Sequence, residues 1–302
     1  MYDIIIIGGG PAGLTAALYA LRAQKSVLVL ERMGVGGQIA LSEKVENFPG
    51  VLSISGQEFA DALLAQVESF GGEVRYENVT EVKPGKVKTV VCETGEYLGK
   101  AVILATGVKN KQLGADGEKA LIGRGVSFCA VCDGRFFKDK DVAVIGGGNT
   151  ALQEAKYLSG IAKTVYLIHR RDEFRAEEWI IKQLKECENV QWILNATVDK
   201  FCGEERLTGL DLNLLKDGTK SHVDVEGAFV AVGQVPQNES FGGVINLTAD
   251  GYAAAGEDCA TNQKGIFVAG DCRKKDIRQL TTAVGDGSVA ALAACKFLEE
   301  SQ

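Results

Sequence analysis

The segment Ile4-Ile5-Ile6-Ile7-Gly8-Gly9-Gly10-Pro11-Ala12-Gly13 joins an unbroken β-branched run to a glycine-rich turn. Such a run is typical of a strand buried on both faces. Downstream, Leu14–Ala23 contains helix-forming residues without a breaker, and the apolar run Val27–Leu30 ends in Glu31. The order strand, glycine turn, helix, strand and acid predicts a βαβ unit of an α/β fold.

Each part of this unit has a role in binding a dinucleotide. Glycines let the backbone turn tightly and approach a pyrophosphate, and the helix N-terminus offers free N–H groups and the positive end of its dipole. An acid at the end of the second strand accepts hydrogen bonds from ribose hydroxyls. The alternative is a glycine-rich turn in an unrelated α/β fold. The residues predicted to form the site are Gly8, Gly10, Pro11, Ala12, Gly13 and Glu31.

The same pattern occurs a second time, beginning at Val142. Val142–Ile145 is a predicted strand, Leu152–Leu158 is a predicted helix and Thr164–Ile168 is a further strand. The turn after the first strand has the sequence Gly146-Gly147-Gly148-Asn149-Thr150-Ala151. Two such units in one chain predict two nucleotide ligands.

The second unit differs from the first at the end of its second strand. Where the first has Glu31, the second has His169-Arg170-Arg171, with Arg175 a little further on. Guanidinium groups pair bidentately with phosphate, whereas a carboxylate would repel it. We therefore expect NADP(H) as the second ligand, with Arg171 and Arg175 on one helix face at i, i+4 spacing. The alternative is a solvated basic helix start that binds no ligand.

A cysteine pair, Cys129-Ala130-Val131-Cys132-Asp133-Gly134, lies shortly before the second unit. In a cytosolic chain a C-x-x-C pair is either half of a zinc site or a redox dithiol. A structural zinc site needs four ligands, usually two close pairs. The chain has no second C-x-x-C, and its histidines, His169 and His222, lie far apart. We therefore predict a dithiol and no metal, with a buried inert pair as the remaining alternative.

The rest of the chain suggests that the second unit is inserted in the first. Glu73–Tyr97 and Val190–Asp224 predict antiparallel β meanders. The short strand Gly265–Ala269, followed by Gly270-Asp271, should complete the sheet that begins at Ile4. The predicted domains are residues 1–111 with 239–302, and residues 112–238.

The last predicted element is an alanine-rich helix over Val284–Glu299, which the chain enters through Gly285-Asp286-Gly287. Asp286 is expected to be a local cap or turn residue there, and not a catalyst.

Composition and charge exclude several classes of protein. A chain of 302 residues most often forms two domains. A net charge of −7 argues against general binding to nucleic acid, which needs a basic face. No apolar run approaches the roughly 18 residues that span a membrane. Met1-Tyr2-Asp3 lacks the basic region of a signal peptide, so we expect a cytoplasmic protein. The six cysteines outside the pair are expected to be small apolar residues, many of them buried.

Together these features resemble the low-molecular-weight, bacterial-type thioredoxin reductases, flavoproteins with two dinucleotide-binding domains. The resemblance covers nearly the whole chain, and it is specific because larger disulfide reductases carry their cysteine pair near the first nucleotide unit. It implies two Rossmann-like, three-layer α/β domains, the second inserted in the first and each with a small β meander. Residues 1–111 and 239–302 would bind FAD, and residues 112–238 would bind NADPH and carry the redox pair.

The resemblance also implies which residues contact each cofactor. For FAD they are Gly8, Gly10, Pro11, Ala12, Gly13, Glu31, Gly37, Gln38, Asn47, Thr106, Gly107, Gly270, Asp271, Arg278 and Gln279. For NADPH they are Gly146, Gly148, Asn149, Thr150, His169, Arg170, Arg171 and Arg175.

The activity implied by the resemblance is that of an NADPH-dependent thioredoxin-disulfide reductase. Electrons would pass from NADPH through FAD and the Cys129/Cys132 disulfide to oxidised thioredoxin or a similar small dithiol protein. Cys132 would be the flavin-proximal sulfur, Cys129 the thiol that attacks the partner, and Asp133 the group that handles the proton. Asp133 could instead be only a turn residue before Gly134. Members of the family are commonly homodimers.

Two other functions remain as alternatives. The first is a ferredoxin-linked or oxygen-linked dithiol oxidoreductase on the same scaffold, although relatives of this kind have lost the NADPH fingerprint, which this chain keeps. The second is a flavin-bound redox sensor without enzymatic activity. Departures from the family pattern are few: Val131 between the cysteines, Gln153 where Glu is common, and Cys272 where Val is frequent.

The arrangement of the sites along the chain also predicts motion. The dithiol and the NADPH site share one domain, yet both must reach a flavin in the other. We therefore expect a domain rotation about linkers near Lys109–Leu113 and Gln234–Ser240.

Overall fold

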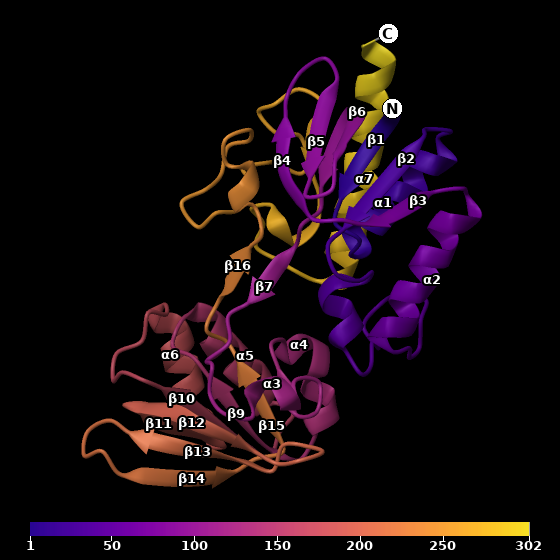
Figure 1. Ribbon diagram of the computed structural model, residues 1–302. Coiled ribbons are helices and arrows are strands. Elements are labelled where there is room, and N and C mark those ends of the chain that lie inside the picture. Colours follow the sequence, from indigo (N-terminus) through magenta and orange to yellow (C-terminus); the bar gives the residue numbers. More distant parts are fainter. Residues whose placement is uncertain (302) are drawn as a thin grey trace. The chain divides into compact units, whose positions relative to one another are not determined.

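The computed structural model describes residues 1–301, which form two compact units (Figure 1). Unit 1 contains Met1–Lys109 and the chain from Val235 onward, and unit 2 contains Asn110–Gln234. Among residues 1–301, no helix has both the length and the apolar character needed to cross a membrane.

Unit 1 is built on a parallel sheet whose central strand is β1. Ile4 lies opposite Val27 of β2 and Ala101 of β6, both in parallel register. β3 extends the sheet beyond β2, and β17 pairs in parallel with β6. The prediction that the strand before Gly270 completes this sheet is therefore confirmed. The strands of unit 1 are β1 (Tyr2–Ile7), β2 (Val27–Glu31), β3 (Glu73–Tyr76), β4 (Val79–Lys83), β5 (Lys88–Cys92), β6 (Glu96–Leu104) and β17 (Ile266–Val268).

An antiparallel extension accounts for the predicted first meander, with one correction. β4, β5 and the first half of β6 pair in antiparallel register. β3 was expected to belong to this meander, but it pairs in parallel with β2. Alternation of side chains alone does not distinguish a parallel edge strand from an antiparallel one, because both have a period of two residues.

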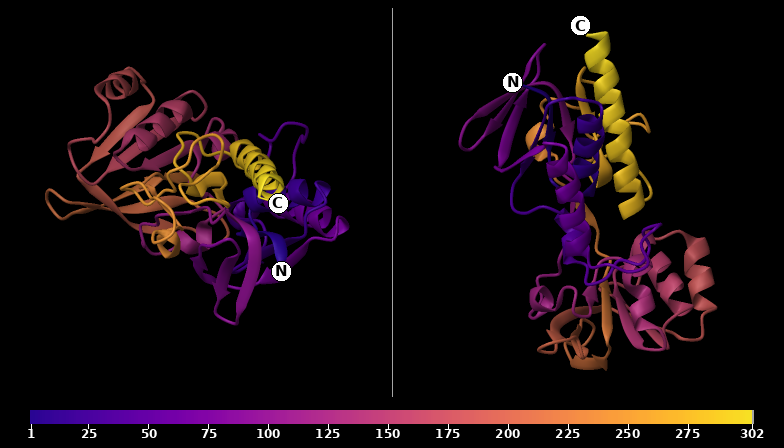
Figure 2. Two further views of the ribbon diagram at one scale, coloured as in Figure 1. Left: turned by 90° about the horizontal axis from the view of Figure 1, so that it is seen from above. Right: turned by 90° about the vertical axis from the view of Figure 1, so that its right-hand side faces the viewer.

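Helices α1 and α7 cover the parallel sheet of unit 1 and pack against each other, and α2 packs on α1 (Figure 2). Pro11 stands in the first turn of α1, where its missing N–H costs nothing. Ser55 and Glu58 form a capping box at the start of α2. The helical segments of unit 1 are α1 (Pro11–Arg22), η1 (Gly37–Leu41), α2 (Gly56–Ser69), η3 (Glu239–Phe241), η4 (Gly270–Cys272) and α7 (Leu280–Glu300).

The start of α7 differs from the prediction. The helix begins at Leu280, so Gly285, Asp286 and Gly287 lie within it. Close packing explains the glycine at 287, because a Cβ there would lie 2.3 Å from the Ala12 carbonyl oxygen of α1. Asp286 is consequently neither a cap nor a turn residue. Its buried carboxylate accepts bonds from Arg273 Nε and Nη2, each at 2.9 Å, and from Lys275 Nζ at 3.0 Å.

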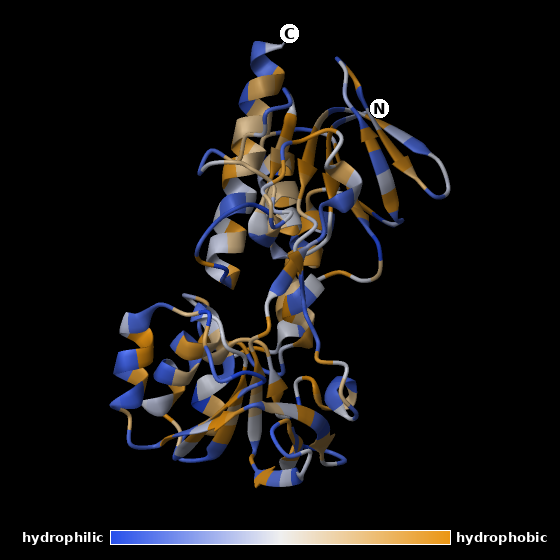
Figure 3. Cartoon of the chain, turned by 90° about the vertical axis from the view of Figure 1, so that its left-hand side faces the viewer, coloured by the Kyte–Doolittle hydropathy of each residue, from blue (hydrophilic) through white to orange (hydrophobic). Residues whose placement is uncertain are grey.

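Unit 2 repeats the parallel arrangement with strand order β11-β10-β9-β15-β8. Its central strands are among the most hydrophobic parts of the chain (Figure 3). Val190–Leu194, expected in a meander, is the parallel edge strand β11, whereas β12, β13 and β14 form the antiparallel meander. The strands are β8 (Val126–Ser127), β9 (Asp141–Ile145), β10 (Thr164–His169), β11 (Val190–Leu194), β12 (Ala196–Cys202), β13 (Gly209–Leu214), β14 (Lys220–Asp224) and β15 (Gly227–Val230). The helical segments are α3 (Glu118–Leu121), α4 (Ala130–Asp133), η2 (Gly134–Phe137), α5 (Asn149–Ser159) and α6 (Glu178–Lys185).

Two short strands, β7 (Val108–Asn110) and β16 (Gln234–Pro236), connect the units and pair with each other. The second boundary lies after Gln234, earlier than the position expected after Asn238. Asn238 belongs to unit 1 because its side chain is fully buried there. Its amide donates to the Gly251 and Cys272 carbonyl oxygens at 3.0 and 2.7 Å.

Candidate redox and nucleotide sites

The two cysteines of the predicted dithiol are joined in a disulfide. Cys129 lies at the N-cap of the short helix α4, and the Cys132 N–H donates to Cys129 Sγ at 3.2 Å. Both cysteines are half-buried, and Val131 between them is 51% exposed. The pair therefore lies at the surface of unit 2, where a disulfide of another molecule can approach it.

Asp133 is held beside the disulfide by Ser127. The Ser127 hydroxyl donates to Asp133 Oδ2 at 2.5 Å, and its oxygen accepts the Cys129 N–H at 3.1 Å. Ser127 is buried at the end of β8. The carboxyl group is thus tied through Ser127 to the backbone of the redox pair.

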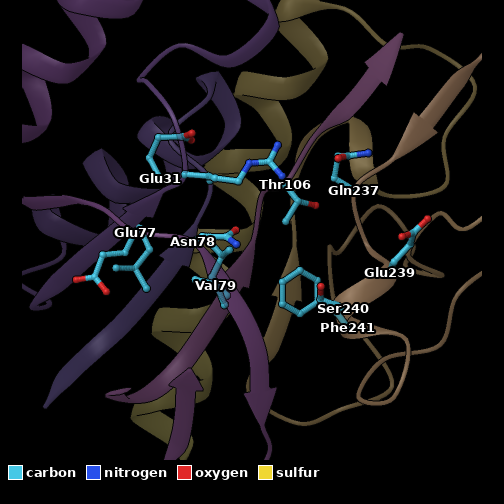
Figure 4. A pocket seen from close by; sticks show the side chains of 13 residues that line it. Glu31, Glu77, Asn78, Val79, Thr106, Gln237, Glu239, Ser240 and Phe241 are labelled. Carbon is cyan, nitrogen blue, oxygen red and sulfur yellow. The ribbon is translucent and has the colours of Figure 1, made fainter. Parts of the chain in front are cut away.

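The first glycine loop lies where β1 ends, and Gly8 adopts φ +113°, which favours glycine. Glu31, at the end of β2, accepts the Gly9 N–H at 2.7 Å and the Met33 N–H at 2.9 Å. A cavity of about 240 Å³ opens at this edge of the sheet (Figure 4). Gly8, Glu31 and Thr106 line it, together with Gln237 and Phe241.

Gly37 and Gly270, two further predicted FAD residues, approach the first turn of α1 and are not among the residues that line that cavity. A Cβ on Gly37 would lie 3.6 Å from Gly10 Cα, and one on Gly270 would lie 2.8 Å from Ala12 Cβ. Gln38 follows Gly37 in η1. The segment after β2 and the segment after β17 therefore both reach the N-terminus of α1.

The last four predicted FAD residues form two contacting pairs. Asn47 Nδ2 donates to Gln279 Oε1 at 3.4 Å, and Arg278 Nε donates to the Asp271 carbonyl oxygen at 3.3 Å. Burial raises the pKa of Asp271, although Lys275 and Arg278 oppose the shift. Oxygen Oδ1 of Asp271 is buried and accepts no hydrogen bond, although it forms an ion pair with Lys275 Nζ at 3.7 Å. Such an atom is suited to receive a donor from a ligand.

The second glycine loop is closed by the arginine segment, although not as predicted. Residues 170–177 form bends and turns, and α6 begins only at Glu178, so Arg171 and Arg175 do not share a helix face. Instead the Arg175 N–H donates to the Gly147 carbonyl oxygen at 2.8 Å. Spacing alone suggested a helix, whereas the segment forms bends and only Arg175 pairs with the backbone of the loop.

His169 packs directly on the same loop. A Cβ on Gly147 would lie 2.1 Å from its Cε1, and its ring stacks on Phe174 at 5.1 Å. Burial, followed by the nearby arginines, lowers the pKa of His169. Arg170, Arg171 and Arg175 are exposed. Asn149, at the start of α5, accepts the Glu177 N–H at 2.8 Å and so joins the loop to the segment before α6.

Comparison with known proteins agrees with this geometry. The model of the pyridine nucleotide-disulphide oxidoreductase family matches residues 2–287. The chain belongs to this family. It is 44% identical over 302 residues to a thioredoxin reductase of Listeria monocytogenes, covering 99% of this chain and 95% of that protein. It is 42% identical over 304 residues to a thioredoxin reductase of Bacillus subtilis, covering 100% and 96% of the two chains.

A solved structure extends the comparison to three dimensions. The crystal structure of thioredoxin reductase from Streptococcus pyogenes superimposes with a TM-score of 0.96 at 39% identity and covers 99% of each chain. The predicted class of fold is confirmed, with two dinucleotide-binding domains. The chain is a flavoprotein disulfide reductase of the thioredoxin-disulfide reductase class, and FAD and NADPH are its cofactors.

The residues present fit two dinucleotides. Neither Gly10 nor Gly148, the N-cap residues of α1 and α5, makes a side-chain cap, so the first N–H groups of both helices remain for phosphate oxygens. No other heavy atom lies within 4 Å of the position of a Cβ on Gly148. The buried Oδ1 of Asp271 adds an acceptor in unit 1.

Glu154 is a residue of this reductase that sequence reasoning missed. Its Oε1 accepts the Ala130 N–H at 3.2 Å, and its Oε2 is buried without a hydrogen-bond partner. Burial, together with the charge of Asp133, raises the pKa of Glu154 to about 7. A signal was present, because Glu154 follows the buried Ala151 by three residues and precedes the buried Ala155, so it lies at the edge of the buried face of α5.

Proposed function

We propose that unit 1 holds FAD, that unit 2 holds NADPH, and that Cys129 and Cys132 pass electrons to the disulfide of a thioredoxin-like protein. One observation carries the proposal: the disulfide stands half-exposed on α4, immediately before the second glycine loop in the chain. The bound nicotinamide and flavin supply the hydride chemistry that delivers two electrons to this disulfide.

In unit 1 we assign three kinds of contact to the chain. The first N–H groups of α1 bind the pyrophosphate, the Glu31 carboxylate accepts ribose hydroxyls, and Asp271 accepts a further hydroxyl through Oδ1. The residues proposed to hold FAD are Gly8, Gly10, Pro11, Ala12, Gly13, Glu31, Gly37, Gln38, Asn47, Thr106, Gly107, Gly270, Asp271, Arg278 and Gln279. The approach of Gly37 and Gly270 to the start of α1, and the contacts of Asn47 with Gln279 and of Arg278 with Asp271, support this assignment.

In unit 2 we assign the pyrophosphate to the start of α5 and the 2′-phosphate to the exposed guanidinium groups. Arg175 supports this best, because its backbone bond to Gly147 keeps it beside the loop. The residues proposed to hold NADPH are Gly146, Gly148, Asn149, Thr150, His169, Arg170, Arg171 and Arg175.

The dithiol works by exchange. The Cys129 thiolate attacks one sulfur of the partner's disulfide, so that bond breaks and a mixed disulfide forms. The Cys132 thiolate then attacks the Cys129 sulfur, which closes Cys129–Cys132 and releases the partner as a dithiol. The partner gains two electrons and two protons, and the two cysteines lose the same. Asp133 carries a proton between Cys132 and the departing thiolate, because its carboxyl group is fixed beside the pair.

We also propose a partner, a cellular location, an oligomeric state and a domain motion for the enzyme. Relatives named thioredoxin reductases support thioredoxin as the partner. We propose a cytoplasmic enzyme, since a reducing compartment keeps its free cysteines reduced. We also propose that the enzyme is a homodimer. Rotation about β7 and β16 would let the dithiol and the NADPH site take turns at the flavin.

Trapping the mixed disulfide tests the assignment of the two sulfurs. The probe is a thioredoxin whose single remaining active-site cysteine carries thionitrobenzoate. Cys132→Ser keeps the attacking Cys129 and should form a stable covalent complex, releasing one coloured thiolate per chain. Cys129→Ser should react at least tenfold more slowly. Faster coupling of Cys129→Ser would reverse the two roles.

An anaerobic titration tests the whole relay. NADPH should bleach the flavin of wild type, Cys129→Ser and Cys132→Ser alike, whereas only wild type should then reduce added thioredoxin. Flavin that stays oxidised in wild type would overturn the NADPH-linked activity and favour a ferredoxin-linked enzyme or a sensor.

A further inference from the structure

The outer face of the meander in unit 2 carries a cluster of side chains that the disulfide reductase activity does not use. Phe201 and Leu210 point into the core of the unit, so their neighbours Cys202 and Asp211 lie on the opposite face. His222 of β14 lies directly opposite Asp211 of β13 in the ladder. Three adjacent strands therefore present a thiol, a carboxylate and an imidazole on one surface.

The ligand-type atoms of Cys202, Asp211 and His222 all lie within 4.8 Å of one another. His222 Nδ1 is 2.6 Å from Asp211 Oδ1, and the Cys202 thiol is hydrogen-bonded to Asp211. In a tetrahedral zinc site with bonds of about 2.0 to 2.3 Å, ligand atoms lie roughly 3.5 Å apart. Small side-chain rotations therefore bring the three atoms to the required spacing, and the strands need not move.

We propose that Cys202, Asp211 and His222 bind a thiophilic divalent metal ion, with zinc as the best fit. Thiolate and imidazole favour zinc over magnesium or calcium, which prefer oxygen ligands. The ion takes the place of the proton now shared between His222 and Asp211, and it also displaces the thiol proton of Cys202. Three protein ligands leave a fourth position for water.

The surroundings of His222 match those of a metal-bound imidazole. Nε2 lies 3.3 Å from Asp224 Oδ1, so Asp224 can accept the Nε2 proton and leave Nδ1 for the metal. Metal-binding histidines commonly have such a carboxylate partner, which fixes the tautomer. Gly209 provides the space, because a Cβ there would lie 2.6 Å from Nε2.

This site is distinct from the predicted dithiol, for which sequence spacing argued against zinc. Its three ligands come from three strands and match no short motif, so only the strand register brings them together. Cys187 offers a matched control. It is also a half-buried free cysteine of unit 2, but its sulfur contacts Lys156 at 3.1 Å and Ser159 at 3.5 Å.

Cobalt(II) titration of the full-length, flavin-loaded enzyme tests the site, with Cys129–Cys132 kept oxidised so that the dithiol cannot bind metal. Wild type should bind one cobalt per chain and show a thiolate-to-cobalt charge-transfer band, which zinc then removes. Cys202→Ser should abolish the band, and Cys187→Ser should leave it unchanged. Asp224→Asn should weaken binding by about tenfold, as expected for a carboxylate that orients a ligand.

Alkylation provides a second measurement that does not depend on activity. Zinc should slow the reaction of Cys202 with iodoacetamide at least tenfold and leave the rate at Cys187 unchanged. Flavin absorbance and the rate of flavin reduction by NADPH should be the same in all variants, which verifies folding. A charge-transfer band that survives Cys202→Ser, or equal zinc effects on the two cysteines, would overturn the proposal.

Discussion

The two glycine loops share one backbone design but have opposite chemical surroundings. In unit 1 the loop is bonded to a carboxylate, Glu31, and the helix α7 packs on α1 through Gly287. In unit 2 the loop is bonded to the arginine segment, and α4 with the disulfide packs on α5. The backbone motif suits a dinucleotide in both units, and in the proposed function the charged neighbours distinguish FAD from NADPH.

One carboxylate from each unit, Asp286 and Glu154, illustrates a similar contrast. In unit 1 burial would raise the pKa of Asp286, but Arg273 and Lys275 outweigh it and lower the pKa. In unit 2 burial raises the pKa of Glu154, and the hydrogen bond from the Ala130 N–H only partly opposes the shift. Unit 1 is thus stabilised by a closed ion-pair network, whereas unit 2 keeps a titratable proton beside its redox pair.

Breaking the network of unit 1 should have the largest effect on stability. Asp286→Asn removes the buried negative charge that pairs with Arg273 and Lys275, which should cost about 3 to 5 kcal/mol of unfolding free energy. The measurement is urea unfolding followed by circular dichroism, with flavin bound. Glu257, the other partner of Arg273, has a side chain 90% exposed, so Glu257→Gln should cost far less and serves as the control. Equal losses of unfolding free energy in the two variants would show that burial of the Asp286 carboxylate does not strengthen its ion pair with Arg273.

Removing the positive charge of unit 2 should change cofactor preference. Replacing Arg170, Arg171 and Arg175 together by Ser should raise the KM for NADPH about a hundredfold, because charge-assisted bonds to a phosphate are lost. The KM for NADH should change little, since NADH has no 2′-phosphate. Steady-state rates with both cofactors measure this. A parallel rise in both values would mean that these residues only maintain the fold.

Glu154 should make stability fall as pH rises. Its pKa is about 7 in the folded protein, against an ordinary value of 4.5, so its stabilising effect is complete below about pH 4.5 and is lost as pH rises through 7. The loss should approach roughly 3 kcal/mol, since one pKa unit corresponds to about 1.4 kcal/mol. Urea unfolding of wild type and Glu154→Gln at pH 5 and pH 8 measures it.

The Glu154→Gln protein should lack that part of the pH dependence. Glu188→Gln, a change at an exposed position of the same unit, provides the control and should retain the wild-type slope. A variant at position 154 with an unchanged slope would show that this carboxyl group does not titrate in the proposed range.

Two glycines of α7 should respond in opposite directions. Gly287→Ala places a methyl group against the Ala12 carbonyl oxygen and should cost about 1 to 3 kcal/mol. No other heavy atom lies within 4 Å of the position of a Cβ on Gly285, so Gly285→Ala should be neutral or stabilise by about 0.5 to 1 kcal/mol. Thermal unfolding of the two variants measures the difference. Equal destabilisation would contradict the close packing of α7 on α1.

Local patterns were sufficient to predict both βαβ units and the parallel strand that completes the first sheet. They were insufficient for β3 and β11, because a period of two residues does not reveal the direction of a neighbouring strand. They also failed for the arginine segment, where backbone pairing with Gly147 overrides helical spacing. The start of α7 was missed because contact with α1 requires a glycine inside the helix.

The sequence by itself determined the class of fold, the two nucleotide units, the redox pair and the expected charge at each loop. Each of these depends on residues that are neighbours in the chain. Only the tertiary structure decided that Asp286 closes an ion-pair network, that Glu154 lies beneath Ala130, and that Cys202 meets Asp211 and His222. These contacts join distant segments, and their energies depend on burial and distance, which no local pattern records.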